Sequence, residues 1–121
     1  MSEASSGKLL ESAIAAWNRG DHDAYMELYH DDVVLHTARG ELRGAASVRA
    51  MYDDVWAAYQ SRLEIDDLIA DDPRVACRYR WIASDKSSSK SFSVPGITIL
   101  HFDSGQCVER WDLEGRPEKH A

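Results

Sequence analysis

Cysteine is scarce in this chain of 121 residues. Only Cys77 and Cys107 are present, 30 positions apart, and no Cys-x-x-Cys pair occurs. Two isolated cysteines provide neither a disulfide framework nor the ligand spacing of a zinc site. Both fall in segments predicted to be strands, where buried thiols are common. We therefore expect no metal centre, and a reducing compartment such as the cytoplasm.

Long apolar runs and basic runs are also absent. No apolar stretch approaches the roughly 20 residues that span a bilayer, and the first residues do not resemble a signal peptide. The 14 Lys and Arg residues are outnumbered by 21 Asp and Glu residues, which gives a net charge of −7. Such a chain repels phosphate backbones and anionic lipid headgroups. We therefore expect neither nucleic acid nor a membrane as a partner, and a cytoplasmic location.

The composition is otherwise that of one globular domain. Hydrophobic residues make up 44 % of the chain and charged residues 29 %, which is ordinary for a soluble protein. A chain of this length forms a single domain, residues 1–121. Its core is expected over about residues 8–113, with a short polar tail at each end.

Three helices are expected in the first half of the chain. Apolar residues at helical spacing from Leu10 to Trp17 predict the first helix, and Gly20 ends it. Asp21 is the expected N-cap of a second, short helix that Asp31-Asp32 ends. The strongest pattern covers residues 45–59, where apolar residues fall at i, i+3, i+4, i+7, i+8 and i+11 and form one stripe.

A hairpin near the end of the chain, Ile97 to Leu113, carries the candidate chemistry. Its two apolar arms flank Ser104-Gly105, which can form a two-residue turn. In that register His101, Arg110 and Asp112 share one face of the sheet. A shift of one residue would change the cross-strand partners.

Three helices followed by four or five antiparallel strands predict an α+β fold. The helices are expected to pack on one face of a strongly curved, mostly antiparallel sheet, which gives a cone-shaped α+β barrel with a pocket at its open end. Trp81 and the outward face of the hairpin present apolar residues that would be exposed to water unless a partner packs against them. We therefore expect a homodimer through the outer face of the sheet.

Several runs resemble the nuclear transport factor 2-like superfamily, and most closely its SnoaL-like branch: AAWNRGDHDAYMELYHDDVVLH, DDPRVACRYRW, VPGITILHF and DSGQCVERWD. The resemblance covers about residues 8–113 and follows five landmarks in the same order. It implies the cone-shaped α+β fold. It leaves the function open, because this superfamily includes polyketide cyclases, steroid isomerases, epoxide hydrolases, dehydratases and non-catalytic binding proteins.

Two enzyme branches fit the sequence poorly. Steroid isomerases need a carboxylate base and two oxyanion donors at positions held here by Thr37, Ala13 and Thr98, and none of these can perform its role. The epoxide hydrolases use an Asp-Arg-Asp set. Arg110 and Asp112 supply an Arg-x-Asp on the last strand, but no second carboxylate is expected to point inward.

The polyketide-cyclase branch implies an aspartate as general acid and base, next to an aromatic residue on the final strand. Asp112, which follows Trp111, fits this position, with His36 and His101 in support and Arg110 assisting. A carboxylate in an apolar pocket can remove a proton from an acidic carbon, and a histidine can donate to the developing oxyanion. This branch implies neither a metal nor a cofactor.

Aromatic side chains are expected to contact the substrate, and their OH and N–H groups to offer hydrogen bonds: Trp17, Tyr25, Tyr29, Tyr52, Trp56, Tyr59, Tyr79 and Trp111. The periodicity of these aromatic residues also fits an ordinary hydrophobic core. His36 and His101 have a similar second interpretation, as buried histidines whose hydrogen bonds are satisfied within the core. Asp112 has a second interpretation, a salt bridge to Arg78, Arg80 or Arg110 at a sheet edge.

The leading hypothesis is a cofactor-independent enzyme of the cyclase, isomerase or hydrolase type that acts on a small, apolar, oxygenated substrate. The alternative is a non-catalytic ligand-binding or dimeric adaptor protein of the same fold. The direction of Asp112 separates the two hypotheses. An inward carboxylate favours chemistry, whereas an exposed carboxylate paired to arginine favours the binding protein.

Overall fold

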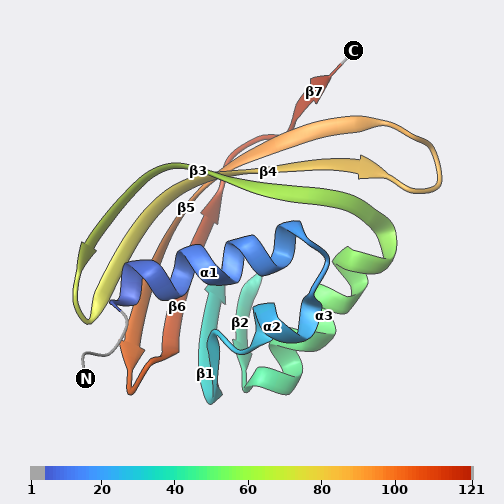
Figure 1. Ribbon diagram of the computed structural model, residues 1–121. Helices are drawn as coiled ribbons and strands as arrows, with labels where there is room; N and C mark the ends of the chain where they lie inside the picture. Colours follow the sequence, from blue (N-terminus) through green and yellow to red (C-terminus); the bar gives the residue numbers. More distant parts are fainter. Residues whose placement is uncertain (1–4, 121) are drawn as a thin grey trace.

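The computed structural model describes residues 5–120, which form three helices and seven strands (Figure 1). In chain order these are α1 (Ser6–Asn18), α2 (His22–Met26), β1 (Tyr29–Thr37), β2 (Gly40–Arg43), α3 (Ala45–Ala58), β3 (Tyr59–Asp71), β4 (Arg74–Asp85), β5 (Ser91–Asp103), β6 (Gln106–Glu114) and β7 (Glu118–His120). Within residues 5–120, no helix is long and apolar enough to cross a membrane.

Local polar groups determine where the first two helices begin and end. The Ser5 side chain accepts a hydrogen bond from the Lys8 N–H at the start of α1, and the Asp21 side chain accepts one from the Ala24 N–H at the start of α2. Gly20, between the two helices, has a φ of +77°. Glycine adopts this left-handed conformation without a steric penalty, so it can end α1 and turn the chain into α2.

The strands form one curved sheet in the order β2-β1-β6-β5-β4-β3, with β7 paired to β5. Every pair is antiparallel except β1 and β6, which run parallel. The long strands β3, β4 and β5 bend together above α1 (Figure 1). Because β2 and β3 are free edges, the sheet curves without closing into a barrel.

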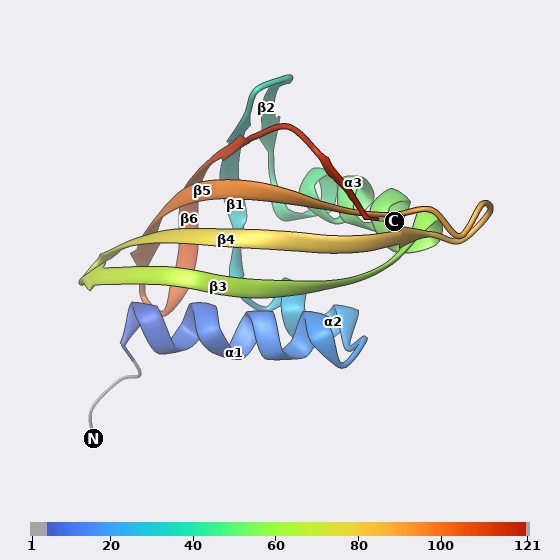
Figure 2. The same ribbon diagram turned by 90° about the horizontal axis from the view of Figure 1, so that it is seen from above.

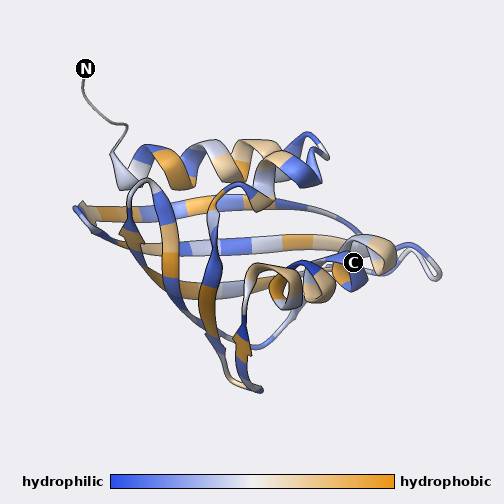
Figure 3. Cartoon of the chain, turned by 90° about the horizontal axis from the view of Figure 1, so that it is seen from below, coloured by the Kyte–Doolittle hydropathy of each residue, from blue (hydrophilic) through white to orange (hydrophobic). Residues whose placement is uncertain are grey.

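The helices cover the concave face of this sheet. Helix α1 packs along β3 and α3 packs against β1, as the view from above shows (Figure 2). Apolar and polar residues alternate along the long strands, so that one face of each of these strands joins the core (Figure 3). Burying one such aliphatic side chain contributes about 1.5–3 kcal/mol. The most deeply buried side chains are Leu10, Tyr25, Val33, Leu35, Val48, Val75, Leu100 and Cys107.

The predicted α+β architecture is confirmed, and α1 and α3 lie where the apolar periodicity indicated. Two strands and the beginning of a third were missed, although residues 33–37 of β1 were predicted as a strand. Residues 40–43, expected as a loop, form β2, and Asp31-Asp32, expected to end a helix, lie inside β1. Part of the expected polar tail, Glu118–His120, forms β7. These segments are rich in exposed polar residues, so they lack the apolar alternation from which strands are predicted.

The closing hairpin has the predicted turn but a different register beyond it. Ser104 and Gly105 both have positive φ, and Phe102 lies opposite Cys107 as expected. The next pair is His101 with Glu109, because Val108 is an extra residue on β6 that forms a β-bulge. The bulge places His101 on the outer face of the sheet, so the prediction that it shares a face with Arg110 and Asp112 was wrong.

Candidate functional site

A cavity of about 310 Å³ lies between the concave face of the sheet and the helices. Most of its wall is apolar, with aliphatic side chains from α3 and β3 and a group of aromatic side chains: Trp17, Tyr25, Tyr52, Tyr79 and Trp81. Charged side chains of β6 form a polar patch on this wall. A small pocket with an aromatic lining and a few convergent polar groups is typical of a small-molecule site.

Strand β6 directs its polar side chains into the cavity because successive residues of a strand alternate between faces. Arg110, Asp112 and Glu114 all line the cavity. Arg110 lies opposite Leu100 and Asp112 opposite Thr98, both of which are buried residues of β5. Since β6 is an interior strand of the sheet, these groups lie beneath the helices and not at an edge.

Arg110 and Asp112 form a shielded ion pair at the base of this patch. The Nε–H of Arg110 donates to Asp112 Oδ1 at 2.9 Å and to Thr98 Oγ1 at 3.0 Å. The two charged side chains are only 9 % and 12 % exposed. Sequence reasoning left open an exposed pair between Asp112 and an arginine. The structure shows that Arg110 is the partner and that the pair lines the cavity.

Three tyrosine hydroxyls complete the environment of Arg110. Its Nη1 donates to Tyr29 Oη at 2.7 Å and to Tyr25 Oη at 3.3 Å. Hydrogen bonds then join Tyr25 to Tyr29 at 2.8 Å and Tyr29 to Tyr52 at 3.0 Å. The network thus connects α2, β1 and α3 to the guanidinium on β6.

The surroundings of Arg110, Tyr29 and Tyr52 shift the pKa values of these three groups. Burial alone would lower the pKa of Arg110, but the charge of Asp112 and the tyrosine oxygens raise that pKa well above its ordinary value. Burial raises the pKa values of Tyr29 and Tyr52 well above the ordinary value, more than the nearby guanidinium lowers them. Arg110 is therefore a permanent cation, and Tyr29 and Tyr52 are neutral hydroxyls.

Tyr79 reaches the cavity across a glycine. Gly96 lies opposite it on β5, and a Cβ atom at Gly96 would be 2.5 Å from the Tyr79 ring carbon Cζ. Burial and the nearby Asp112 carboxylate raise the pKa of Tyr79. Within residues 5–120 its hydroxyl makes no hydrogen bond, so it is available as a neutral donor at the cavity wall.

Six of the predicted site residues therefore lie together on the wall of the cavity. Arg110, Asp112 and four of the predicted aromatic residues, Trp17, Tyr25, Tyr52 and Tyr79, line the cavity. Tyr29 and Trp56 are buried in the adjoining core, and Tyr59 packs against Trp81 and Phe92. The catalytic and binding roles of all these residues remain predictions.

Both predicted histidines and Trp111 lie on the opposite face of the sheet. His36 pairs with Trp111 between β1 and β6, stacks on its ring, and contacts Glu109 at 2.7 Å. His101 lies opposite Glu109 on the same outer face. The parallel pairing of β1 with β6 determines the position of His36, and the bulge at Val108 determines that of His101. Neither histidine lies beside Asp112.

Sequence reasoning missed several residues of the cavity wall, among them Glu114 and Trp81. Glu114 was assigned to the polar tail, although it continues the alternation of residues 110 and 112 on β6. Trp81 was expected on an outer dimer surface, whereas it lies opposite Leu63 and lines the cavity. Extending the two-residue period of each strand by one position would have identified Glu114.

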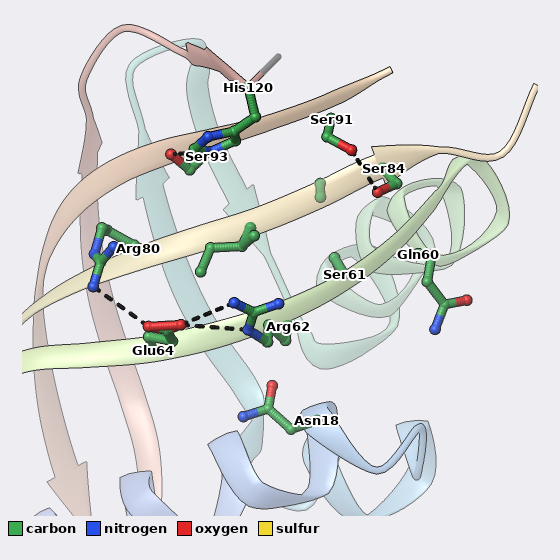
Figure 4. Close-up of a pocket in the computed structure, with 12 residues that line it drawn as sticks. Asn18, Gln60, Ser61, Arg62, Glu64, Arg80, Ser84, Ser91, Ser93 and His120 are labelled. Atoms are coloured by element: carbon green, nitrogen blue, oxygen red, sulfur yellow. Dashed lines mark hydrogen bonds and ion pairs between the residues drawn. The ribbon is translucent and has the colours of Figure 1, made fainter. Parts of the chain in front are cut away.

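A second, more open hollow of about 570 Å³ lies along β3, β4, β5 and β7 (Figure 4). Its lining is polar. Glu64 contacts both Arg62 and Arg80, and Ser93 is hydrogen-bonded to His120. Its charges therefore compensate one another in contact with water, whereas the inner cavity holds a carboxylate and a guanidinium away from water. Nowhere in residues 5–120 do three His, Cys, Asp or Glu side chains gather as metal ligands would.

Substituting Tyr29 by Phe tests the hydrogen-bond network. The change removes the 2.7 Å bond to Arg110 and should lower the free energy of unfolding by about 1.5–3 kcal/mol, the range for hydrogen bonds to charged groups. Tyr59→Phe is the control, because its hydroxyl makes no hydrogen bond with residues 5–120, and its change should stay within about 0.5 kcal/mol. Equal effects of the two variants in urea unfolding would contradict a network centred on Arg110.

The same fold occurs in solved structures of low sequence identity. AclR, a candidate hydroxylase from Streptomyces galilaeus, has a TM-score of 0.82 at 24 % identity, over 91 % of this chain and 88 % of that chain. A candidate polyketide cyclase from Pseudomonas putida KT2440 has a TM-score of 0.77 at 20 % identity, over 91 % of each chain. An LEH-like epoxide hydrolase from M. tuberculosis has a TM-score of 0.79 at 14 % identity, over 91 % and 82 %.

These identities establish a shared fold and no more than that. Among curated proteins no relative matches the sequence. A family model, the SnoaL-like domain, matches residues 10–110, which is most of the chain. The matched segment includes all three helices nearly in full and ends at Arg110 on β6. The chain therefore belongs to the SnoaL-like family.

Proposed function

We propose that the inner cavity is the active site of a cofactor-independent enzyme that moves protons on a small, apolar, carbonyl-containing substrate. Asp112 would be the general base, and Arg110 and Tyr79 would stabilise the oxyanion. The observation that carries this proposal is the position of the Asp112 carboxylate. It is 12 % exposed, held by Arg110 at 2.9 Å, and lies on the wall of an aromatic-lined cavity.

The geometry leaves one carboxylate oxygen available for chemistry. Oδ1 of Asp112 accepts from Arg110, whereas Oδ2 accepts no hydrogen bond from residues 5–120. Within the same residues, Nη2 of Arg110 and the hydroxyl of Tyr79 also have no hydrogen-bond partner. When Oδ2 takes a proton from carbon, negative charge develops on the substrate oxygen, and a fixed donor can stabilise it in a site shielded from water.

The proposal differs from the sequence-based one in its oxyanion donors. Because His36 and His101 lie on the outer face, Arg110 and Tyr79 take the role that the histidines were expected to play. The names of several structural relatives support an enzymatic role, since a candidate cyclase, a candidate hydroxylase and an epoxide hydrolase share the fold. The substrate of this chain is proposed only by class.

A ligand-binding protein without catalysis is the second candidate. It is favoured by the fact that Arg110 neutralises Asp112, because a compensated ion pair can position a polar ligand without transferring its proton. The same cavity would then hold an apolar oxygenated molecule and release it unchanged. The two functions differ in whether a bound molecule with an acidic C–H reacts.

The test uses 5-nitro-1,2-benzisoxazole, which a carboxylate base in an apolar pocket opens to a coloured phenoxide. The wild-type protein should accelerate this elimination with saturation, and Asp112→Asn should lower kcat/KM on the order of 10²-fold by removing the base. Asn still accepts the hydrogen bond from Arg110 but removes its counter-charge, so urea unfolding of the variant checks that it is folded at the assay temperature. His101→Gln, on the outer face, is the matched control and should retain the wild-type rate.

Two results would contradict the catalytic proposal. One is a rate that Asp112→Asn leaves unchanged. The other is wild-type protein that binds the probe, as seen by a raised melting temperature, without accelerating its opening. The second result would favour the ligand-binding alternative.

We also propose that a second copy of the chain covers the outer face of the sheet. Ile97 and Leu113 lie opposite each other on β5 and β6, next to Ile99 and Trp111, and all four are 40–67 % exposed. The charged side chains on the two sides of this patch already form ion pairs within one chain, Arg78 and Arg80 with Asp66, and Glu41 with Arg43. The apolar patch itself would therefore supply the contact between two copies related by a two-fold axis.

Light scattering of the eluted protein tests this assembly. The wild type should have the mass of a dimer at micromolar concentration, and Leu113→Lys should reduce it to the mass of a monomer, because it places a charge in the apolar patch. Ile69→Lys is the control. Ile69 is equally exposed, at 66 %, but lies on β3, outside the patch. A monomeric wild type would refute the proposed dimer.

A further inference from the structure

A second carboxylate, Glu114, lies on the same wall of the cavity as Asp112. Both belong to β6 and both line the cavity. Residues two apart on a strand point to the same face, with Cα atoms about 6.6 Å apart. Glu114 lies opposite Gly96, the residue whose missing side chain leaves room for the Tyr79 ring. The two carboxylates thus flank the Tyr79 side of the pocket.

The environments of these two carboxylates differ. Asp112 is shielded from water and ion-paired with Arg110. Glu114 is exposed, and within residues 5–120 it makes no ion pair or side-chain hydrogen bond. The charged and titratable groups around it are Asp112, Arg110, Arg39 of the β1–β2 turn, and Tyr79 of β4.

Glu114 holds its proton more readily than an ordinary glutamate. Partial burial and the neighbouring Asp112 carboxylate raise the pKa of Glu114 above its ordinary value, more than Arg39 and Arg110 lower it. A carboxyl group whose surroundings favour its protonated form can act as a general acid. This shift agrees with the geometry, which already places both carboxylates on one wall.

We infer that Glu114 is the general acid of the site and returns a proton to the substrate oxygen while Asp112 removes one from carbon. This inference rests on the proposed function. In the step, the carbon-bound hydrogen moves to Asp112 Oδ2 as a proton, and the C–H electron pair passes into the substrate towards its oxygen. Glu114 gives its proton to that oxygen. Exchange with water then returns Asp112 to the carboxylate and Glu114 to the acid.

The test compares two probes that differ in the basicity of the leaving oxygen. In 1,2-benzisoxazole and in its 5-nitro derivative, loss of the C3 proton forms the C≡N bond and breaks the N–O bond, whose electron pair stays on oxygen. The nitro group stabilises the phenoxide, so the nitro probe needs no acid. The unsubstituted probe leaves as a stronger base and benefits from proton donation.

Glu114→Gln should slow the opening of 1,2-benzisoxazole on the order of 10²-fold and that of the nitro derivative less than about threefold. The retained nitro reaction shows that the variant is folded and that Asp112 still acts. Glu118→Gln, an exposed glutamate of β7, is the matched control and should slow neither reaction. Asp112→Asn should slow both.

The pH profile gives a second measure. A general acid acts when protonated, so the wild-type kcat/KM for 1,2-benzisoxazole should fall as pH rises through the pKa of Glu114, above the ordinary range for glutamate. Glu114→Gln should lose this limb and Glu114→Asp should retain it. Equal slowing of both probes by Glu114→Gln, or no slowing of either, would overturn the inference. Insensitivity of both reactions to Asp112→Asn would overturn the proposed function with it.

Discussion

The structure depends on the burial of one guanidinium. Arg110 lies on an interior strand beneath the helices, where an unpaired cation would cost several kcal/mol. Asp112, Thr98 and two tyrosines compensate it with hydrogen bonds of 2.7–3.3 Å. Removing one partner of such a buried pair costs about 3–5 kcal/mol. The wall of the cavity can therefore be stable only when strand β6, helix α2 and strand β1 are assembled together.

The contacts that compensate the buried Arg110 also determine the geometry of the candidate site. The contacts that satisfy Arg110 also determine where the Asp112 carboxylate points, because one of its oxygens is held by the Nε–H. The aromatic residues around the pair exclude water and make the field of the remaining polar groups stronger. The Asp112 carboxylate and the Arg110 guanidinium are thus held together by contacts that stabilise the fold. In the proposed function, these stabilising side chains would also transfer the proton and stabilise the oxyanion.

The sequence predicted the elements with the strongest periodicity. Helix α3 has one continuous apolar stripe, and the turn at Ser104-Gly105 was evident from its residues, so both lie where expected. The alternation along β6 also indicated correctly that Arg110 and Asp112 share a face. These features depend on the spacing of apolar and polar residues along the chain, which can be read from a single sequence.

Features that depend on pairing between distant strands could not be read in the same way. A bulge of one residue at Val108 reverses the face of His101, and the parallel pairing of β1 with β6 places His36 outside the cavity. No residue type signals either event. Glu114 is a different case, because its position followed from the period of β6 and was missed only where the strand was assumed to end.

The most direct measurement is a crystal structure of the protein with 2-cyano-4-nitrophenol, the product of the nitro probe. The proposed site predicts the ring against the aromatic wall of the inner cavity, with the phenol oxygen within hydrogen-bond distance of Arg110 Nη2 or Tyr79 Oη, and Asp112 next to the carbon that lost its proton. A molecule bound only in the polar hollow of Figure 4, or an empty cavity at saturating concentration, would contradict the assignment of this cavity as the active site.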